Sequence, residues 1–242
     1  ELSEKSKNNL EWFWQSVEQD IGVVWDSPYE KILDTSNGIA WSKWFIQGKT
    51  NIYKSSVEKF SKTNPKKIAY HFESEDGMKS QITYSELDTK VSKFANALKS
   101  LGVKKGDVIA IYLPMIQDAI ISILAAAKIG AIQTVIFSGY SSESLCIRLR
   151  DCNAKFLIVS DGFSRKGKHV SQKEAVDVAI NTTDIEKVIL VPYKGVDSYV
   201  ESEKIIHLDR LLSTQNGICD TEIVDSEHPL FILYTSGTTG NP

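Results

Sequence analysis

The chain of 242 residues contains few cysteines, and they are scattered along it. Cys146, Cys152 and Cys219 are too few for a disulfide framework and lack the paired spacing of a zinc site. The four histidines are dispersed in the same way and show no spacing typical of metal ligands. We therefore expect no metal site built from this chain's own residues, and we expect the protein in a reducing cytoplasm.

The chain also lacks an uninterrupted apolar run of the roughly 20 residues that a membrane-spanning helix requires. The longest largely apolar stretch, residues 116–132, predicts a buried helix instead. It is interrupted by Gln117, Asp118, Ser122, Lys128 and Gly130. The first residues, ELSEK, are charged and lack the apolar centre of a signal peptide. We expect no membrane partner.

A strong excess of charge of one sign is absent too. The 28 Lys and Arg residues nearly balance the 31 Asp and Glu residues, for a net charge of −3. Such a chain has no basic footprint for DNA or RNA, so we expect no nucleic-acid partner. With 42% hydrophobic and 24% charged residues, the composition is that of a globular protein with one large domain or two small ones.

What the chain does have is an aromatic amino-terminal segment. All five tryptophans fall within the first 44 residues, at Trp12, Trp14, Trp25, Trp41 and Trp44. The few lysines among them are too sparse for a surface that stacks nucleic-acid bases. We expect residues 1–50 to form an extension that packs on the core, with a helix at 8–20 and an irregular segment at 25–48. Residues 51–242 are expected to form the first part of the main domain.

From residue 51 the pattern alternates between helices and strands. A helix is expected at 53–60 and strands at 68–72 and 81–83. Thr83 and Glu86 then fit a capping box, and apolar residues at helical spacing predict a helix that ends near Gly102. Apolar runs at 108–113, 132–137, 156–159 and 188–191 alternate with helical stretches at 116–129, 142–151 and 171–180. This alternation predicts an α/β fold with a largely parallel sheet flanked by helices.

The last apolar run, residues 229–234, is expected to form a buried strand that leads into a loop of small residues. The loop is Thr235, Ser236, Gly237, Thr238, Thr239 and Gly240. Its two glycines allow the backbone to approach an anion closely, and its hydroxyl groups can donate to phosphate oxygens. Two residues between the glycines exclude a Walker P-loop, which requires four. A simple linker or turn is the alternative interpretation.

Several segments together resemble the acetyl-CoA synthetase branch of the acyl-adenylate-forming, AMP-binding enzymes. An aromatic extension of that branch is similar to Trp12-Phe13-Trp14, Trp25 with Pro28, and Trp44-Phe45 with residues 48–51. Further matches are 82–87 (ITYSEL), 102–107 (GVKKGD), 112–115 (YLPM), 129–131 (IGA), 135–141 (VIFSGYS) and 230–240 (LFILYTSGTTG). The resemblance covers nearly the whole chain.

The resemblance implies one site for coenzyme A, formed by two segments, and one site for ATP. The turn Phe137, Ser138 and Gly139 and the basic segment Arg165, Lys166, Gly167 and Lys168 match the family's positions for the adenosine 3′-phosphate end of coenzyme A. Lys168 replaces a second arginine and Ser138 replaces a common glycine. The first change weakens bidentate phosphate recognition. Composition alone favours a solvated basic loop at residues 165–168, and the positional match with the family favours coenzyme A binding instead. Residues 235–240 would bind the ATP phosphates.

The function implied is that of an AMP-forming short-chain acyl-CoA synthetase that uses ATP, Mg²⁺, coenzyme A and a short carboxylic acid. The family's catalytic residues lie beyond its phosphate loop, so we expect none in this chain, which would be the amino-terminal portion of a longer enzyme trimmed at its ends. A homo-oligomer is compatible with this assignment. A non-catalytic module that binds a nucleotide or a partner chain is the alternative. Acetate, propionate and hydroxylated short acids all fit.

Overall fold

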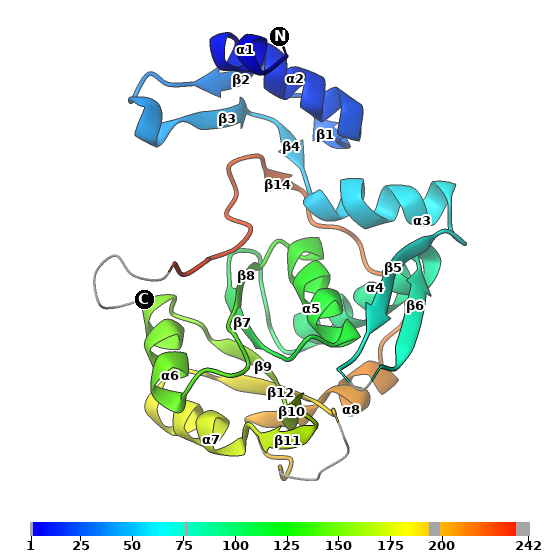
Figure 1. Ribbon diagram of the computed structural model, residues 1–242, viewed down its shortest axis with the longest axis vertical. Coiled ribbons are helices and arrows are strands. Elements are labelled where there is room, and N and C mark those ends of the chain that lie inside the picture. Colours follow the sequence, from blue (N-terminus) through cyan, green and yellow to red (C-terminus); the bar gives the residue numbers. More distant parts are fainter. Residues whose placement is uncertain (1, 76, 194–198, 236–242) are drawn as a thin grey trace.

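A parallel five-stranded sheet forms the centre of the molecule, in a computed structural model that describes residues 2–75, 77–193 and 199–235 (Figure 1). The strand order is β13-β12-β9-β7-β8, and every neighbouring pair in it is parallel. This confirms the predicted fold class. The strands are β7 (Val108–Tyr112), β8 (Ile132–Val135), β9 (Phe156–Ser160), β12 (Lys187–Val191) and β13 (Ile205–His207).

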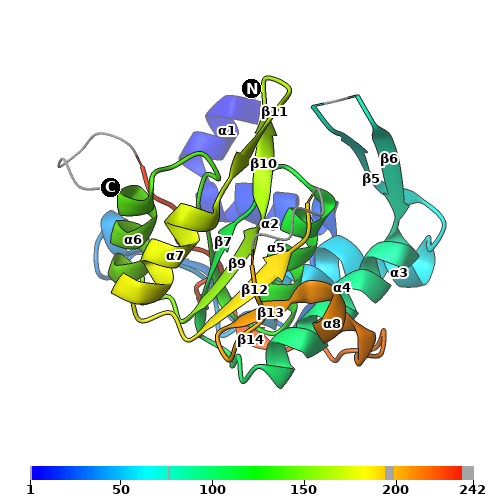
Figure 2. The same cartoon turned by 90° about the horizontal axis from the view of Figure 1, so that it is seen from below.

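Helices cover both faces of this sheet (Figure 2). Along β7, Ile109 and Ile111 enter one apolar core, while Ala110 and Tyr112 enter the other, because successive side chains of a strand point to opposite faces. The strands β7, β9 and β12 are therefore buried on both sides, as their continuous apolar runs predict. The helices are α4 (Tyr84–Ser100), α5 (Gln117–Lys128) and α8 (Leu208–Ser213) on the first face, and α6 (Ser142–Asp151) and α7 (Lys173–Thr182) on the second.

The two strands predicted before the helix at Thr83 are present, and they pair as a hairpin. β5 (Ile68–Glu73) pairs with β6 (Lys79–Thr83) in an antiparallel ladder. The capping box at the start of α4 is confirmed: the Glu86 backbone N–H donates to Thr83 Oγ1 at 3.3 Å, and the Thr83 N–H donates to the Glu86 carboxylate at 2.9 Å. Gly102 follows the helix with a φ of 90°, a left-handed conformation that favours glycine.

The amino-terminal arm is more regular than expected and forms the upper part of Figure 1. The prediction of an irregular segment at 25–48 was wrong, since this segment contains three short strands that were too short to show a period of two. Ring contacts pack the arm internally, with Trp14 and Trp44 centroids 5.5 Å apart, whereas Trp41 is 75% exposed. The arm comprises α1 (Leu2–Asn8), α2 (Leu10–Ile21), β1 (Trp25–Ser27), β2 (Lys31–Asp34), η1 (Ile39–Trp41), β3 (Lys43–Ile46) and β4 (Lys49–Thr50).

A small sheet joins the arm to the far end of the chain. β4 pairs on one side with β1 and on the other with β14 (Val224–Asp225), both antiparallel. Lys49 donates to the Asp225 carboxylate at 2.7 Å across this ladder. The helical turns η2 (Lys54–Glu58) and α3 (Lys59–Thr63) then lead into the β5–β6 hairpin.

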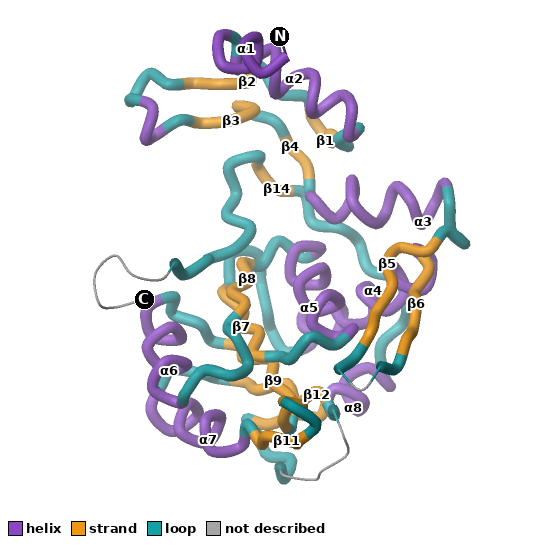
Figure 3. The backbone as a smooth tube through the Cα atoms, viewed as in Figure 1, coloured by secondary structure: helices purple, strands orange, loops and turns teal. Residues whose placement is uncertain are grey.

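The buried strand expected at 229–234 is not present, and this prediction was wrong. Only Phe231 bridges the edge of β8, opposite Gln133, and Figure 3 draws the segment as a loop. The Gln133 backbone N–H donates to Leu230 O at 3.2 Å, and the Gln133 backbone carbonyl accepts from the Ile232 N–H at 2.9 Å. Phe231 and Leu233 are 53% and 70% exposed. An apolar run forms a buried strand only where neighbours cover both of its faces, and among the described residues only one face of this segment meets the core.

A second hairpin was missed. β10 (Gly162–Arg165) pairs with β11 (Lys168–Ser171), joined by Lys166 and Gly167. Their φ values of 51° and 73° are both positive, as in the two-residue turn that suits a β-hairpin. None of the described helices has the length and apolar character that crossing a bilayer requires.

Candidate functional site

A cavity of about 580 Å³ opens where the central strands end. Its walls come from segments that follow the carboxyl ends of β7, β8, β9 and β12, and from the turn between β5 and β6. Figure 2 shows the β5–β6 and β10–β11 hairpins projecting from the same side of the molecule. In open α/β sheets ligands bind outside the carboxyl ends of the parallel strands. The position of the cavity therefore marks it as the candidate ligand site.

The cavity brings together residues from both predicted coenzyme A segments. Phe137, Ser138 and Arg165 all line it, although 26 residues separate Ser138 from Arg165 in the chain. Phe137 is 63% exposed and presents its ring to the open space. Ser138 is buried. An exposed ring beside an arginine can stack a flat aromatic group while the guanidinium meets an anion.

The space beside Gly139 is filled by a side chain of the same turn. A Cβ atom placed on Gly139 would lie 2.7 Å from Cε1 of Phe137, so the ring of Phe137 itself occupies the space beside this glycine. Gly139 lines a smaller hollow of about 300 Å³ next to the main cavity, together with Tyr140 and Gln172. The glycine thus lets the Phe137 ring lie against the backbone.

Two buried polar side chains hold the turn at 137–140, and sequence reasoning missed both. The Gln172 amide nitrogen donates to Ser138 O and to Tyr112 O, each at 3.3 Å, while its oxygen accepts from the Ser160 hydroxyl at 2.5 Å. The Tyr112 hydroxyl donates to Tyr140 O at 2.7 Å. Gln172 belongs to no motif in the sequence, and the matched segment 112–115, which begins with Tyr112, gave no sign that this side chain supports the turn. Only the packing of β7, β9 and α7 reveals what they support.

The basic segment lies at the tip of the β10–β11 hairpin, and all four of its residues are exposed. Arg165 and Lys168 are directly opposite each other in the ladder, so both side chains leave the same face of the hairpin. Lys166, Gly167 and Lys168 are not among the described residues that line the cavity. The Lys166 N–H donates to the Glu75 carboxylate at 2.6 Å, which ties this tip to the β5–β6 hairpin. The pair of cations is thus placed at the rim of the cavity.

The walls of the cavity carry acidic groups as well. Glu73, Glu75 and Asp118 line it beside Arg165. Burial raises the pKa of the Asp118 carboxyl above its ordinary value, and Lys90 opposes that shift. Carboxylates repel phosphate, so an anionic group would favour the part of the wall near Arg165 and Lys168 over the part formed by Glu73 and Asp118.

The predicted phosphate loop lies mostly outside the described residues. This holds for Ser236, Gly237, Thr238, Thr239 and Gly240. Thr235 is described and exposed. The preceding Tyr234 is fixed to α6, since its hydroxyl donates to Asp151 Oδ2 at 2.7 Å and to Arg148 O at 3.2 Å. Burial, together with the bond to Asp151, raises the pKa of Tyr234.

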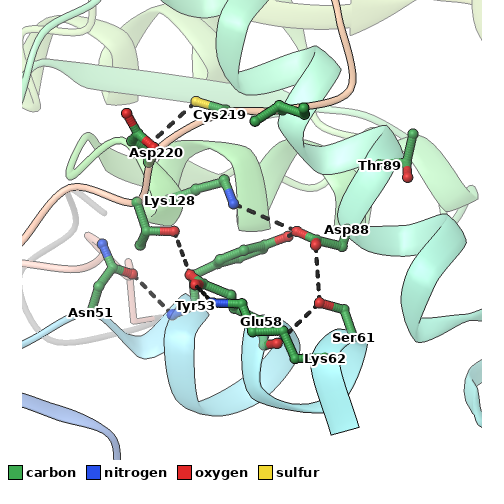
Figure 4. Close-up of polar contacts among 12 residues, drawn as sticks. Asn51, Tyr53, Glu58, Ser61, Lys62, Asp88, Thr89, Lys128, Cys219 and Asp220 are labelled. Atoms are coloured by element: carbon green, nitrogen blue, oxygen red, sulfur yellow. Dashed lines mark hydrogen bonds and ion pairs between the residues drawn. The ribbon is translucent and has the colours of Figure 1, made fainter. Parts of the chain in front are cut away.

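A buried polar cluster lies at the other end of α5 from the cavity (Figure 4). Lys128, only 2% exposed, places its ammonium 3.5 Å from Asp88 Oδ1 and 4.1 Å from the centre of the Tyr53 ring. The Asp88 carboxylate also accepts from the Tyr53 hydroxyl at 2.6 Å and from the Ser61 hydroxyl at 3.0 Å. This cluster joins α5, α4 and the helical turns of residues 54–63. Lys128 lies roughly 15 Å along the helix from Asp118, so the cluster supports the fold and not the cavity.

Asn51 fastens the segment before this cluster. Its amide nitrogen donates to Ala127 O and Glu222 O, each at 2.8 Å, and its oxygen accepts from the Tyr53 N–H at 2.9 Å. In the part of the chain that the structure describes, no three His, Cys, Asp or Glu side chains are placed to hold a metal ion.

Comparison with known families and proteins places this geometry in context. The model of the "AMP-binding enzyme" family matches residues 57–242, and that of the "Acetyl-coenzyme A synthetase N-terminus" matches residues 1–55. The acetyl-coenzyme A synthetases of Methanothrix thermoacetophila and Streptomyces avermitilis are 43% and 41% identical to the chain. Each alignment covers 100% of this chain and 37% of the relative.

A solved structure shows the same fold. The acetoacetyl-CoA synthetase from Streptomyces lividans superposes with a TM-score of 0.89 at 27% sequence identity. The superposition covers 99% of this chain and 36% of that one. The chain therefore spans a little over a third of the length of the proteins it is similar to.

Proposed function

The chain belongs to the AMP-binding enzyme family, and we propose that it is the amino-terminal portion of an AMP-forming short-chain acyl-CoA synthetase. The names of its relatives support this proposal, as does the match of residues 1–55 to the acetyl-coenzyme A synthetase N-terminus. We propose residues 1–50 as the extension and 51–242 as the first part of the AMP-binding large domain, ending in the phosphate loop. The few scattered cysteines support a cytoplasmic location.

In the proposed reaction a carboxylate attacks the α-phosphate of ATP, which gives an acyl-adenylate and pyrophosphate. The thiol of coenzyme A then displaces AMP to give the acyl-CoA. Residues 235–240 are proposed to donate hydrogen bonds to the ATP phosphates, which lowers the cost of charge developing there. Mg²⁺ would accompany ATP, and we assign it no ligand in this chain. The substrate acid would be acetate, propionate or a hydroxylated short acid.

One observation carries the coenzyme A assignment. Two segments matched separately by resemblance, 137–139 and 165–168, meet at the carboxyl ends of the sheet strands, and both contribute to the walls of one cavity. A nucleotide ring would stack near Phe137. The 3′-phosphate would lie at the rim, where Arg165 and Lys168 share one face of the hairpin.

Replacement of Arg165 tests this assignment in the complete synthetase. Arg165→Ala should raise the KM for coenzyme A roughly tenfold, because one charge-assisted contact is lost and solvent screens the site. The KM for ATP in carboxylate-dependent ATP–pyrophosphate exchange should stay unchanged. Arg210→Ala, at another exposed arginine that is paired with Glu201, is the matched control.

Dephospho-coenzyme A makes this test specific, because it lacks the 3′-phosphate. Wild type and Arg165→Ala should use it about equally well. Equal impairment with coenzyme A and with dephospho-coenzyme A would show that Arg165 does not bind this phosphate. Residues 165–168 would then be a solvated turn.

A further inference from the structure

Helix α6 contacts both segments that the proposed function assigns to substrates. Its last turn holds Tyr234, the residue directly before Thr235, through the hydrogen bonds to Asp151 and to Arg148 O. Its first residues follow the turn at 137–140 without a break, since the helix begins at Ser142. A side chain on the exposed edge of α6 can therefore contact both segments.

Arg148 makes both contacts. Its guanidinium carbon lies 4.4 Å from the centre of the Tyr140 ring and 5.4 Å from that of the Tyr234 ring, both within the range of a cation–π interaction. Nη1 also donates to Ser144 O at 2.8 Å, which fixes the orientation of the guanidinium. The ring of Tyr140 in turn packs edge-on against Phe137, with centroids 5.6 Å apart.

These contacts form one continuous row. It runs from Phe137, in the wall of the cavity, through Tyr140 and Arg148 to Tyr234, at the entrance of the phosphate loop. Arg148 is half-buried, so its cation is only partly screened by solvent. Each contact restrains a ring that lies on a loop and not on a strand or helix, where the backbone alone holds its position less firmly.

We propose that Arg148 is a positioning residue that fixes the coenzyme A turn and the start of the phosphate loop at the same time. The inference rests on the proposed function, because it assigns a role only if both segments bind substrates. Arg148 touches neither substrate in this assignment. It acts through Tyr140 on one side and through Tyr234 on the other.

The test compares substitutions in the complete synthetase. Arg148→Met keeps the aliphatic stem but removes the cation, so it should raise the KM for ATP in exchange and the KM for coenzyme A in thioester formation, each roughly 2- to 30-fold. Arg148→Lys keeps a cation, so both of its KM values should lie closer to those of wild type. Tyr234→Phe removes only the hydroxyl bonds and should raise the KM for ATP alone.

Arg150→Met is the matched control. Arg150 lies on the same helix, but its guanidinium donates to Thr182 O, away from both segments. This variant should leave both KM values at the wild-type level. A purely structural role of Arg148 would lower the melting temperature or kcat without moving either KM.

Three results would overturn the inference. Arg148→Met could have the same KM values as Arg150→Met, or Arg148→Lys could be as impaired as Arg148→Met. The third is that Arg148→Met raises only one of the two KM values. If Arg148→Met does not fold, Arg148→Gln, which also removes the cation but keeps a polar end, decides by the same two KM values. Failure of the proposed function itself looks different, because wild type would then show no carboxylate-dependent exchange at all.

Discussion

The side chain of Lys128 shows what burial of a single charge demands. Its ammonium is nearly inaccessible to water, and Asp88 supplies the compensating charge. Asp88 can do this because two hydroxyl groups, from Tyr53 and Ser61, complete its hydrogen bonds. Burial, and then the bond to Asp88, raises the pKa of Tyr53, so its hydroxyl stays protonated and remains a donor.

We predict that the single substitution Asp88→Ala destabilises the protein more than the double substitution of Asp88→Ala together with Lys128→Met. Removing one partner of a buried ion pair leaves an uncompensated charge, at a cost of about 3 kcal/mol. Replacing the ammonium as well removes that charge, so the double variant should recover at least about 1 kcal/mol. Denaturant unfolding of this chain measures both values.

Asp177→Ala is the control for this prediction. Asp177 pairs with Lys173 on the surface of α7, with both side chains more than 40% exposed. Such a pair contributes at most about 1 kcal/mol, so its loss should change stability little. If the double variant were as unstable as Asp88→Ala, the loss of stability would come from the hydrogen bonds that Asp88 accepts from the two hydroxyl groups, and not from the unpaired charge of Lys128.

At the scale of elements, the β10–β11 hairpin shows how a turn sets the placement of charges. The two-residue turn at Lys166 and Gly167 fixes the register of the ladder. That register places Arg165 opposite Lys168. A longer or different turn would shift the pairing and move one cation to the other face. The conformation of Gly167 thus determines whether Arg165 and Lys168 lie on the same face of the hairpin, where both can contact one anion.

Gly167→Val should therefore weaken coenzyme A use. A β-branched residue at a φ of 73° costs roughly 1–2 kcal/mol. If the turn changes its conformation to relieve this strain, the population of the hairpin that can bind coenzyme A falls roughly 5- to 30-fold. The KM for coenzyme A then rises in proportion. Carboxylate-dependent exchange should be unaffected, because the hairpin is not assigned to ATP.

Gly167→Asn separates conformation from the absence of a side chain. Asparagine tolerates the left-handed region, so this variant should keep a KM for coenzyme A close to that of wild type. If Gly167→Asn and Gly167→Val raised the KM for coenzyme A equally, backbone conformation would not be the cause. A side chain at the tip would then impair binding directly, for example by contact with the ligand.

At the scale of the whole molecule, distant parts of the chain hold one another in place. The arm is joined to the segment at 224–225 through β4, more than 170 residues away in sequence. The Ser226 hydroxyl adds a bond to Phe45 O at 2.7 Å. The segment that leads to residues 229–235 therefore starts from a position fixed by the arm.

We predict that the 242-residue chain by itself does not catalyse carboxylate-dependent ATP–pyrophosphate exchange. It spans 37% of the length of its acetyl-coenzyme A synthetase relatives, and we assign it binding residues only. The assay should use acetate, propionate and 3-hydroxypropionate, with the complete synthetase as the positive control. Robust exchange by the chain alone would show that it carries the catalytic groups, and our assignment of them elsewhere would be wrong.

The sequence by itself determined the central architecture. Runs such as 108–113 and 156–159 are apolar at every position, and a strand of that kind is stable only when both of its faces are buried. The capping box at Thr83 and Glu86 is likewise local, because its hydrogen bonds join residues three apart. The motifs that carry the family resemblance are also contiguous, so they could be read without knowledge of the fold.

Only the tertiary structure decided which distant residues meet. Apolar character at 229–234 could not reveal that among the described residues only one face of the segment meets the core, so the expected strand was wrong. Nothing in the sequence placed Gln172 beneath the turn at Ser138, or Arg148 between Tyr140 and Tyr234. Such contacts depend on how sheet and helices pack, and local pattern carries no information about packing across the chain.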